Sequence, residues 1–211
     1  MIPSEKEWTD ALIARHGPAL HGRFSSATVA VCGLGGLGSN IAVALARAGV
    51  GKLLLLDFDR VDITNLHRQQ YKANQIARYK TEALAENLRE IAPYTEIRPV
   101  TAKITEENLA DLLKGADIVC EAFDGAEFKA MLVNGVLEQL PRCYLVAASG
   151  MAGMDTPNNI KTRKITNRFY LCGDETSDAA DTIGLVAPRV MLCAAHQAHT
   201  VLRILAGEYD V

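Results

Sequence analysis

The sequence has little that would point to a membrane, a nucleic acid or a secretory route. No run of residues is apolar enough and long enough to span a bilayer. The amino-terminal stretch MIPSEKEWTDALIARHG lacks the apolar core of a secretory signal. The formal net charge is -3, whereas nucleic-acid-binding domains usually carry an excess of basic residues. We therefore expect a cytoplasmic protein that binds neither membrane nor nucleic acid.

Cysteine is also scarce, with five in 211 residues and no C-x-x-C pair. Structural zinc sites are commonly built from such pairs, so no zinc is expected. Cys172, within FYLCGDETSD, is assigned to a loop, where a thiol beside polar residues could be partly exposed and reactive. Neighbouring Asp174 and Glu175 would raise its pKa, and both a structural and a catalytic role stay open. The other four, in apolar runs, are interpreted as small buried side chains: Cys32, Cys120, Cys143 and Cys193.

What is present is a globular composition with alternating strand and helix patterns. The chain is 49% hydrophobic and long enough for one domain with its own core. The patterns predict strands at about 28–32, 53–57, 97–100, 118–121 and 144–148, and helices at 5–14, 37–48, 73–91, 106–113, 126–140 and 189–205. Thr105 is the expected cap of the fourth helix.

This alternation predicts a doubly wound, Rossmann-like α/β fold with a mainly parallel sheet. The pattern weakens between residues 150 and 184, which are rich in Gly, Asp, Asn and Thr. Within that stretch, the segments 160–166 and 169–171 are expected to extend the sheet in the antiparallel direction.

A glycine loop joins the first predicted strand to the first long helix, in the sequence TVAVCGLGGLGSN (28–40). Gly33, Gly35 and Gly38 fit the G-x-G-x-x-G pattern, and Gly36 gives the backbone further room. Such a loop can approach a phosphate closely and direct a helix amino terminus at it. Asp57 ends the next strand, where an acid usually binds ribose hydroxyls. The motif alone does not separate NAD, FAD, SAM and ATP.

The run DFDRVDITNLHRQ (57–69) carries more polar groups than a ribose requires. Asp59, just past the strand end, could hold Mg2+ through carboxylate oxygens and waters. Arg68 offers a planar fork for phosphate oxygens. Asn65 and Gln69 can donate neutral hydrogen bonds to the same anion. This combination predicts a site for a polyphosphate that reacts, rather than for a retained redox cofactor.

Two further charged residues fit this interpretation. Lys80, near the start of the next helix, adds a positive charge for phosphates. Asp124 follows the strand 118–121 at the same sheet edge, where it could share the metal. It could also serve as the amino-terminal cap of the helix that starts near residue 126.

At this point the sequence resembles a known family. GLGGLGS, then D-x-D-x-V-x-x-x-N-L-x-R-Q, a helix lysine and an acid after a later strand are similar to the ThiF/MoeB group. The similarity covers about residues 29–124 and resumes at GLVAPRVMLCAAHQAHTVLRILAG (184–207). The resemblance implies an ATP- and Mg2+-dependent adenylyltransferase that acts on the C-terminal glycine carboxylate of a small ubiquitin-like sulfur-carrier protein with a Gly-Gly terminus. The chain is most similar to the short ThiF-type proteins of thiamine biosynthesis.

The resemblance also implies positions for the site residues. Gly35 and Gly36 would lie beneath the nucleotide, Asp57 would bind the ribose and Asp124 would coordinate Mg2+. The expected contacts of the triphosphate are Asn65, Arg68, Gln69 and Lys80.

Three further expectations come from the resemblance. A homodimer is expected, in which an arginine from an amino-terminal helix reaches the partner's phosphates; Arg15 is preferred and Arg23 is the alternative. The chain is expected to be one adenylation domain over residues 1–211, with a helical arm (1–27) and a crossover-loop region (150–184). Cys172 lies where a thiol for sulfur transfer would be sought, although its flanking residues do not match.

Other functions stay open at this stage. The glycine loop and Asp57 would also suit an NAD-dependent oxidoreductase. That enzyme would leave Asp59, Arg68 and Lys80 without a role, and no catalytic histidine is evident. A protein that binds the nucleotide without turnover and a ThiF-like protein that serves another carrier or pathway are further alternatives.

Overall fold

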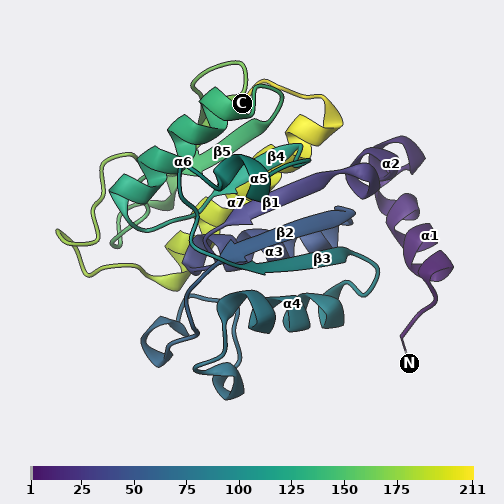
Figure 1. Ribbon diagram of the computed structural model, residues 1–211, viewed down its shortest axis with the longest axis horizontal. Coiled ribbons are helices and arrows are strands. Elements are labelled where there is room, and N and C mark those ends of the chain that lie inside the picture. The colour runs from purple at the N-terminus through teal and green to yellow at the C-terminus, as the bar shows by residue number, and fades with distance from the viewer. Residues whose placement is uncertain (1) are drawn as a thin grey trace.

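The computed structural model of the protein describes residues 2–211, in which one twisted sheet lies between two layers of helices (Figure 1). The strands are β1 (Thr28–Cys32), β2 (Lys52–Asp57), β3 (Glu96–Thr101), β4 (Ile118–Glu121), β5 (Tyr144–Ala148), β6 (Lys161–Lys164) and β7 (Phe169–Gly173). Their order is β3-β2-β1-β4-β5-β7-β6. Neighbours from β3 to β7 are parallel, and β6 is antiparallel to β7. The predicted Rossmann-like sheet with an antiparallel extension is confirmed.

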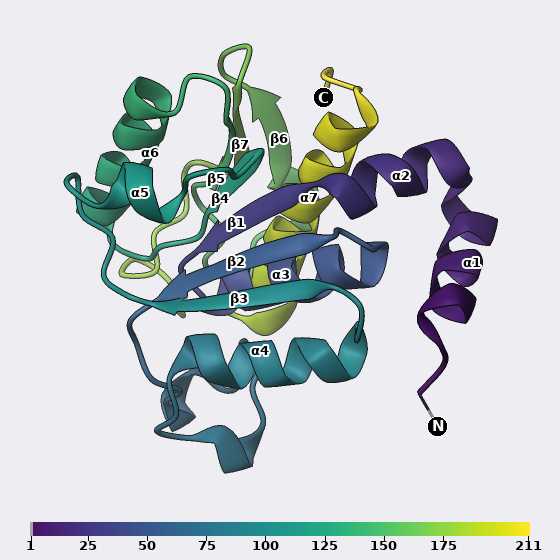
Figure 2. The same ribbon diagram turned by 45° about the vertical axis from the view of Figure 1, so that its right-hand side comes forward.

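Helices cover both faces of this sheet (Figure 2). The α-helices are α1 (Glu5–His16), α2 (Pro18–Ser26), α3 (Gly36–Ala48), α4 (Lys80–Ile91), α5 (Leu109–Leu112), α6 (Ala126–Gln139) and α7 (Ala187–Ala206). Short 3-10 helices are η1 (Ile63–Asn65), η2 (Ala73–Gln75) and η3 (Pro157–Asn159). Helices α3, α4 and α7 pack on one face, and α5 and α6 pack on the other. Within residues 2–211, no helix is both long and apolar enough to cross a membrane.

The leucine run of β2 explains why the sheet needs both helical layers. Leu53 and Leu55 belong to the core under α3, α4 and α7, whereas Leu54 and Leu56 belong to the core under α5 and α6. Successive side chains of a strand point to opposite faces, so a strand covered on both faces is apolar throughout. The four leucines are at most 3% exposed. Burial of each contributes roughly 1.5–3 kcal/mol, which fixes the strand that ends at Asp57.

The predicted helix 73–91 was wrong at its start, because α4 begins at Lys80. Ala77 has a φ of +70°, a left-handed conformation that cannot continue a helix. Its N–H donates to the Val61 carbonyl at 2.9 Å, and the Val61 N–H donates to the Arg78 carbonyl at 2.9 Å. Pairing with residue 61 therefore overrides the local helix propensity.

One further predicted helix needs correction, and one helix was not predicted. The predicted helix 106–113 shrinks to the single turn α5, because the Asn108 side chain accepts the Thr105 N–H at 2.8 Å and donates to the Lys103 carbonyl at 3.0 Å. Such local side-chain bonds favour a turn over a helix. The sequence also failed to predict α2, which begins with Pro18 in its first turn directly after Gly17.

Candidate functional site

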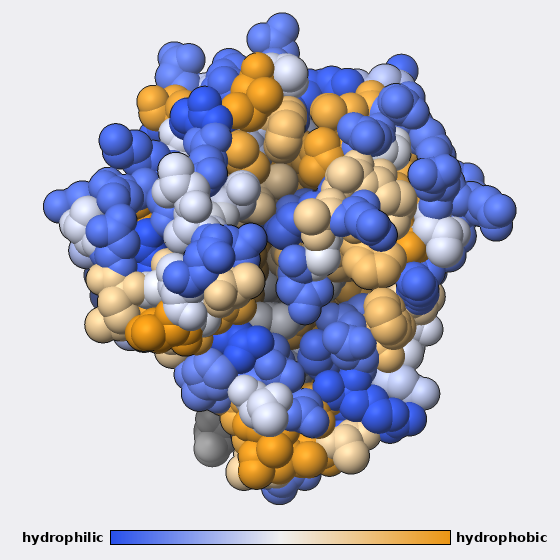
Figure 3. All heavy atoms as spheres, turned by 90° about the vertical axis from the view of Figure 1, so that its left-hand side faces the viewer, coloured by the Kyte–Doolittle hydropathy of each residue, from blue (hydrophilic) through white to orange (hydrophobic). Residues whose placement is uncertain are grey.

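A cleft of about 630 Å³ opens at the carboxyl-terminal edge of the sheet. The chain continues from β1 to β2 on one side, whereas β4 and β5 lie on the other side of β1. Doubly wound sheets bind ligands at such a change of direction. Figure 3 looks onto this edge and shows the surface hollowed near its centre, with hydrophilic residues along the lower border of the hollow.

The glycine loop forms the start of what we call the first wall, which also includes Asp57, Asp59, residues 65–69 and Lys80. Gly33 has a φ of +88°, and a Cβ there would lie 2.8 Å from the Ala122 carbonyl oxygen. Gly35 and Gly36 line the cleft at the amino terminus of α3. Gly38 does not line it; a Cβ at Gly38 would overlap the Gly33 carbonyl, so this glycine lets α3 pack against the loop.

Asp57 links the end of β2 to the glycine loop. One carboxylate oxygen accepts the Leu34 N–H at 2.6 Å, and the other accepts the Asp59 N–H at 2.8 Å. Tyr71, which the sequence did not indicate, donates from its hydroxyl to the Leu34 carbonyl at 2.7 Å. Burial, together with Asp57 and Asp59, raises the pKa of Tyr71, which therefore stays a donor. Asp57 lines the cleft with free lone pairs for a further donor.

Lys80 and Asp59 form an ion pair across the first wall. The Lys80 Nζ lies 2.8 Å from Asp59 Oδ2. The lysine side chain is 8% exposed, whereas that of Asp59 is 51% exposed. In this pair the ammonium group is buried and the carboxylate is exposed, and both residues line the cleft.

Arg68, Asn65 and Gln69 complete the first wall. Arg68 Nη2 donates to Asn65 Oδ1 at 2.7 Å, so the amide group of Asn65 has its own donors left for the cleft. Burial lowers the pKa of Arg68, and the charge of Asp124 opposes that shift. Arg68 Nε and Gln69 Oε1 are buried and have no hydrogen-bond partner within residues 2–211. Unpaired buried polar atoms are costly in a finished protein, so this pair fits a site that a polar ligand completes.

Asp124 lines the cleft from the end of β4. The sequence left open a capping role, but the cap of α6 is Gly125 and has no side-chain hydrogen bond. That alternative is therefore wrong, because the chain turns into α6 one residue later. Asp59 and Asp124 both line the cleft, although no group of three His, Cys, Asp or Glu residues within 2–211 could hold a metal. Mg2+ commonly uses one or two carboxylates plus substrate phosphates, and this donor set suits that mode.

Sequence reasoning missed a buried ion pair between Glu121 and Lys129, of which Lys129 lines the cleft. The Glu121 side chain is 1% exposed, and Lys129 Nζ lies 3.0–3.1 Å from its two oxygens and 3.1 Å from the Ala148 carbonyl. Burial raises the pKa of Glu121, and Lys129 opposes the shift. A glutamate at the end of an apolar strand, eight residues before a helix lysine, was the available signal. Apolar cleft residues were missed as well, including Phe58, Ile104 and Phe123.

The side of the cleft facing the first wall comes from later parts of the chain. We call it the second wall: residues 149–152 after β5, 177–179 after β7, and Leu185 and Val190 before and within α7. His67 ties the two walls together, since its Nε2 lies 3.1 Å from the Leu185 carbonyl. Sequence analysis assigned His67 no role, and this contact gives it a structural one.

Cys172 requires a correction, because the expected loop position is wrong. The residue belongs to β7 and its side chain is fully buried. Burial raises the pKa of the Cys172 thiol to about 11, opposed by contacts with Thr162 and Thr200. A buried, protonated thiol is a poor nucleophile.

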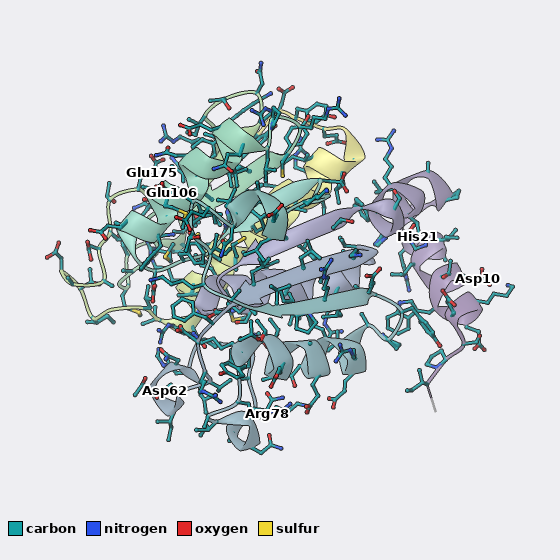
Figure 4. The ribbon with its side chains drawn as sticks, in the orientation of Figure 1. Asp10, His21, Asp62, Arg78, Glu106 and Glu175 are labelled. Carbon is teal, nitrogen blue, oxygen red and sulfur yellow. The ribbon has the colours of Figure 1, made fainter. Side chains whose placement is uncertain are left out.

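The amino-terminal arginines lie far from the cleft of their own chain. Asp10 of α1 and His21 of α2 are at the end of the molecule opposite Glu175, which adjoins the second wall (Figure 4). Arg15, on α1, is exposed, and Arg23 donates to the Ala206 carbonyl. A contact of either arginine with a partner's site stays a prediction.

The fold and the cleft define a doubly wound α/β protein with a polar site at its switch point. Residues 10–211 match the profile of the ThiF family. The tRNA threonylcarbamoyladenosine dehydratase of Haemophilus influenzae is 33% identical over 141 residues, which are 66% of this chain and 53% of that protein. The sulfur carrier protein ThiS adenylyltransferase of Bacillus subtilis is 30% identical over 204 residues, 93% of this chain and 60% of that protein.

The solved structures agree on the fold. The E. coli tRNA N6-threonylcarbamoyladenosine dehydratase in complex with ATP superposes with a TM-score of 0.85 at 21% identity, covering 99% of this chain and 98% of that one. The chain belongs to the ThiF family, which confirms the resemblance found in the sequence. It spans a little over half the length of the two curated relatives named above.

Proposed function

We propose that the protein is an ATP-dependent adenylyltransferase that activates the C-terminal glycine carboxylate of a small ubiquitin-like sulfur carrier. One observation carries the proposal: the Arg68 guanidinium, whose buried Nε has no partner within residues 2–211, lies in the wall where the α3 amino terminus and the Lys80 ammonium also lie. Cations, amides and a helix amino terminus together suit a polyphosphate.

The reaction follows from this placement. A carrier carboxylate oxygen attacks the α-phosphorus of ATP, the bond between the α-phosphorus and its bridging oxygen breaks, and pyrophosphate leaves. The product is an acyl-adenylate. Arg68 and Lys80 stabilise the negative charge that grows on the leaving pyrophosphate, since fixed charges in a partly dry site need no reorganisation.

The remaining residues position the nucleotide. Asp57 accepts from the ribose hydroxyls, Asn65 and Gln69 donate to phosphate oxygens, and the backbone at Gly35 and Gly36 lies beneath the phosphates. Phe58, 51% exposed at the cleft, offers an aromatic surface to the purine.

Mg2+ is the metal that the donor set fits, with Asp124 as its main carboxylate ligand and Asp59 as the second. When bound, it would neutralise charge on the phosphates. Asp59 is suited to this by its exposure, since its side chain is 51% exposed and Lys80 contacts only Oδ2.

The assembly we propose follows the family expectation. Residues 1–211 act as one adenylation unit, with the arm at 1–27 and the crossover-loop region at 150–184. The unit works as a homodimer in which Arg15 reaches the partner's phosphates. Thiamine biosynthesis is the proposed pathway, supported by the match to the ThiS adenylyltransferase across 93% of the chain.

Carrier-dependent exchange of radiolabelled pyrophosphate into ATP tests the function. The expected result is exchange with a carrier that ends in Gly-Gly and none with the same carrier lacking the last glycine. Exchange that needs no carrier, or a nicotinamide in the purified protein, would contradict the proposal. Mixing Arg15→Ala with Lys80→Ala subunits should restore part of the activity if the arginine acts across the dimer.

A second candidate is a dehydratase acting on a tRNA-linked threonylcarbamoyladenosine. It is favoured by the 33% identity to the Haemophilus influenzae protein. The net charge of -3 argues against an RNA substrate. Incubation with ATP and tRNA bearing this nucleoside, followed by mass analysis, decides between the two, because only a dehydratase would convert the nucleoside.

A further inference from the structure

The second wall is supported by a buried ion pair that the proposed chemistry does not use. Arg189, in the first turn of α7, pairs with Asp174, which directly follows β7. The side chains are 5% and 3% exposed. A buried pair requires nearly complete hydrogen bonding to be tolerated, so its partners indicate its purpose.

The partners of Asp174 lead directly into the cleft. Its carboxylate accepts the backbone N–H groups of Thr176 and Ser177 at 2.9 and 2.8 Å, and the Ser177 hydroxyl at 2.8 Å. The same Ser177 hydroxyl accepts the N–H of Ala152 at 3.0 Å. Ser177 and Ala152 both line the cleft. The carboxylate therefore sets the positions of both loops of the second wall.

Arg189 ties the same wall to a third loop and to α7. Its Nη1 donates to the carbonyls of Asp155 and Thr156 at 2.6 and 2.9 Å. Its neighbour Val190 lies against Gly36, where an added Cβ would be 2.9 Å from Val190 Cγ1. The pair thus joins three loop segments of the 149–177 region to the helix that touches the glycine loop.

Backbone hydrogen bonds and a close approach join the two loops where they cross. The Asp174 N–H donates to the Gly150 carbonyl at 2.9 Å, and the Glu175 N–H donates to the Ser149 carbonyl at 3.0 Å. A side chain at Gly150 would overlap the Asp174 carboxylate. The lining of the second wall carries no cation: beside the small residues it has the apolar Met151, Leu185 and Val190 and the acidic Asp178. Such a lining suits an extended, uncharged peptide segment more than a polyphosphate.

We infer that Asp174 and Arg189 are positioning residues that hold the second wall in place for the carrier's C-terminal segment. This inference rests on the proposed function. It assigns the two substrates to different sides of the cleft: the first wall binds ATP, and the second wall binds the carrier tail.

The test measures KM for carrier and for ATP in pyrophosphate exchange with R189M, R189K, D174N and S177A. R189M and D174N should raise the KM for carrier about tenfold or more, the equivalent of a lost charged hydrogen bond, while the KM for ATP changes less than about twofold. R189K and S177A should give smaller shifts in the same direction. R203M, on the outer part of α7, is the matched control and should change neither constant.

A second readout does not need the carrier. Limited proteolysis should cleave the segment 176–183 faster in R189K and S177A than in the R203M control, while calorimetry shows unchanged ATP affinity. Equal rises in both KM values, or an unchanged KM for carrier in folded R189K and S177A, would overturn the inference. If the wild type shows no carrier-dependent exchange, the proposed function fails, and unchanged proteolysis would then separately refute the positioning role.

Discussion

Each wall of the cleft has an ion pair, one within the first wall and one behind the second, and the pairs differ in exposure. In the first wall, the Lys80 side chain is buried, whereas that of Asp59 is 51% exposed. Behind the second wall, the side chains of Asp174 and Arg189 are both at most 5% exposed. An exposed carboxylate can take a new partner when a ligand arrives, whereas a pair that is fully hydrogen-bonded and dry cannot exchange partners without a large cost. Similar residue types thus serve binding in one wall and support in the other.

The walls also differ in how the chain builds them. The first wall beyond the glycine loop comes from residues 57–80, which follow one strand. The second wall comes from loops after β5 and β7 and from α7, which are adjacent because β5 and β7 pair in parallel. A local motif can supply ligand-binding groups, whereas a wall made of distant loops needs an internal support.

The largest expected effect is on stability, and it tests whether the second pair is structural support. R189M should lower the free energy of unfolding by about 3–5 kcal/mol, because it leaves the Asp174 charge buried and unpaired. R203M should change it by less than about 0.5 kcal/mol, since Arg203 pairs with an exposed glutamate. Urea unfolding measures both. A small effect of R189M on the free energy of unfolding would show that the Asp174–Arg189 pair is not a structural support.

The next effect is on turnover, and it tests the first wall. R68A and K80A should each reduce pyrophosphate exchange about 10²- to 10³-fold, the usual loss when a charge-stabilising donor is removed. Both variants should stay folded by circular dichroism. Exchange at the wild-type rate in either variant would show that the first wall does not contact the reacting phosphates.

A smaller effect concerns acid stability. Burial would raise the pKa of Asp174, but hydrogen bonds from Ser177 and Thr176 and the contact with Arg189 lower it to about 2, from 3.8. The folded state therefore binds this proton more weakly than the unfolded state. The resulting stability of about 2 kcal/mol is present above about pH 4 and is lost as the pH falls towards 2. Urea unfolding at pH 6 and pH 3 should show a smaller loss in D174N than in the wild type.

The smallest effect concerns Cys172. Because the thiol is buried in β7 and its pKa is raised to about 11, C172A should leave exchange within about twofold of wild type and cost about 1 kcal/mol of stability. A thiol reagent should label Cys172 only after unfolding. Rapid labelling of Cys172 in the native protein would contradict its assigned place.

Several features could be predicted because they depend on local sequence. The apolar strands, the glycine loop and the run from Asp57 to Gln69 placed the first wall at the correct sheet edge. Family membership followed from the same motifs. The errors fell where distant contacts override local preference, as at Ala77, which pairs with Val61 instead of continuing a helix. Cys172 was misplaced because Gly173 and a polar, acidic segment follow it in the sequence, so the predicted strand ended at residue 171, whereas β7 continues to Gly173.

The sequence by itself determined the class of fold and the polar groups of the first wall, because period, glycine spacing and residue type act over a few residues. Only the tertiary structure decided the second wall. The pairing of Asp174 with Arg189, fifteen residues apart, requires β7 to lie beside β5 and α7 to pack under the sheet. No local sequence pattern specifies this contact, since the two side chains meet only after the strands have paired and water has been excluded.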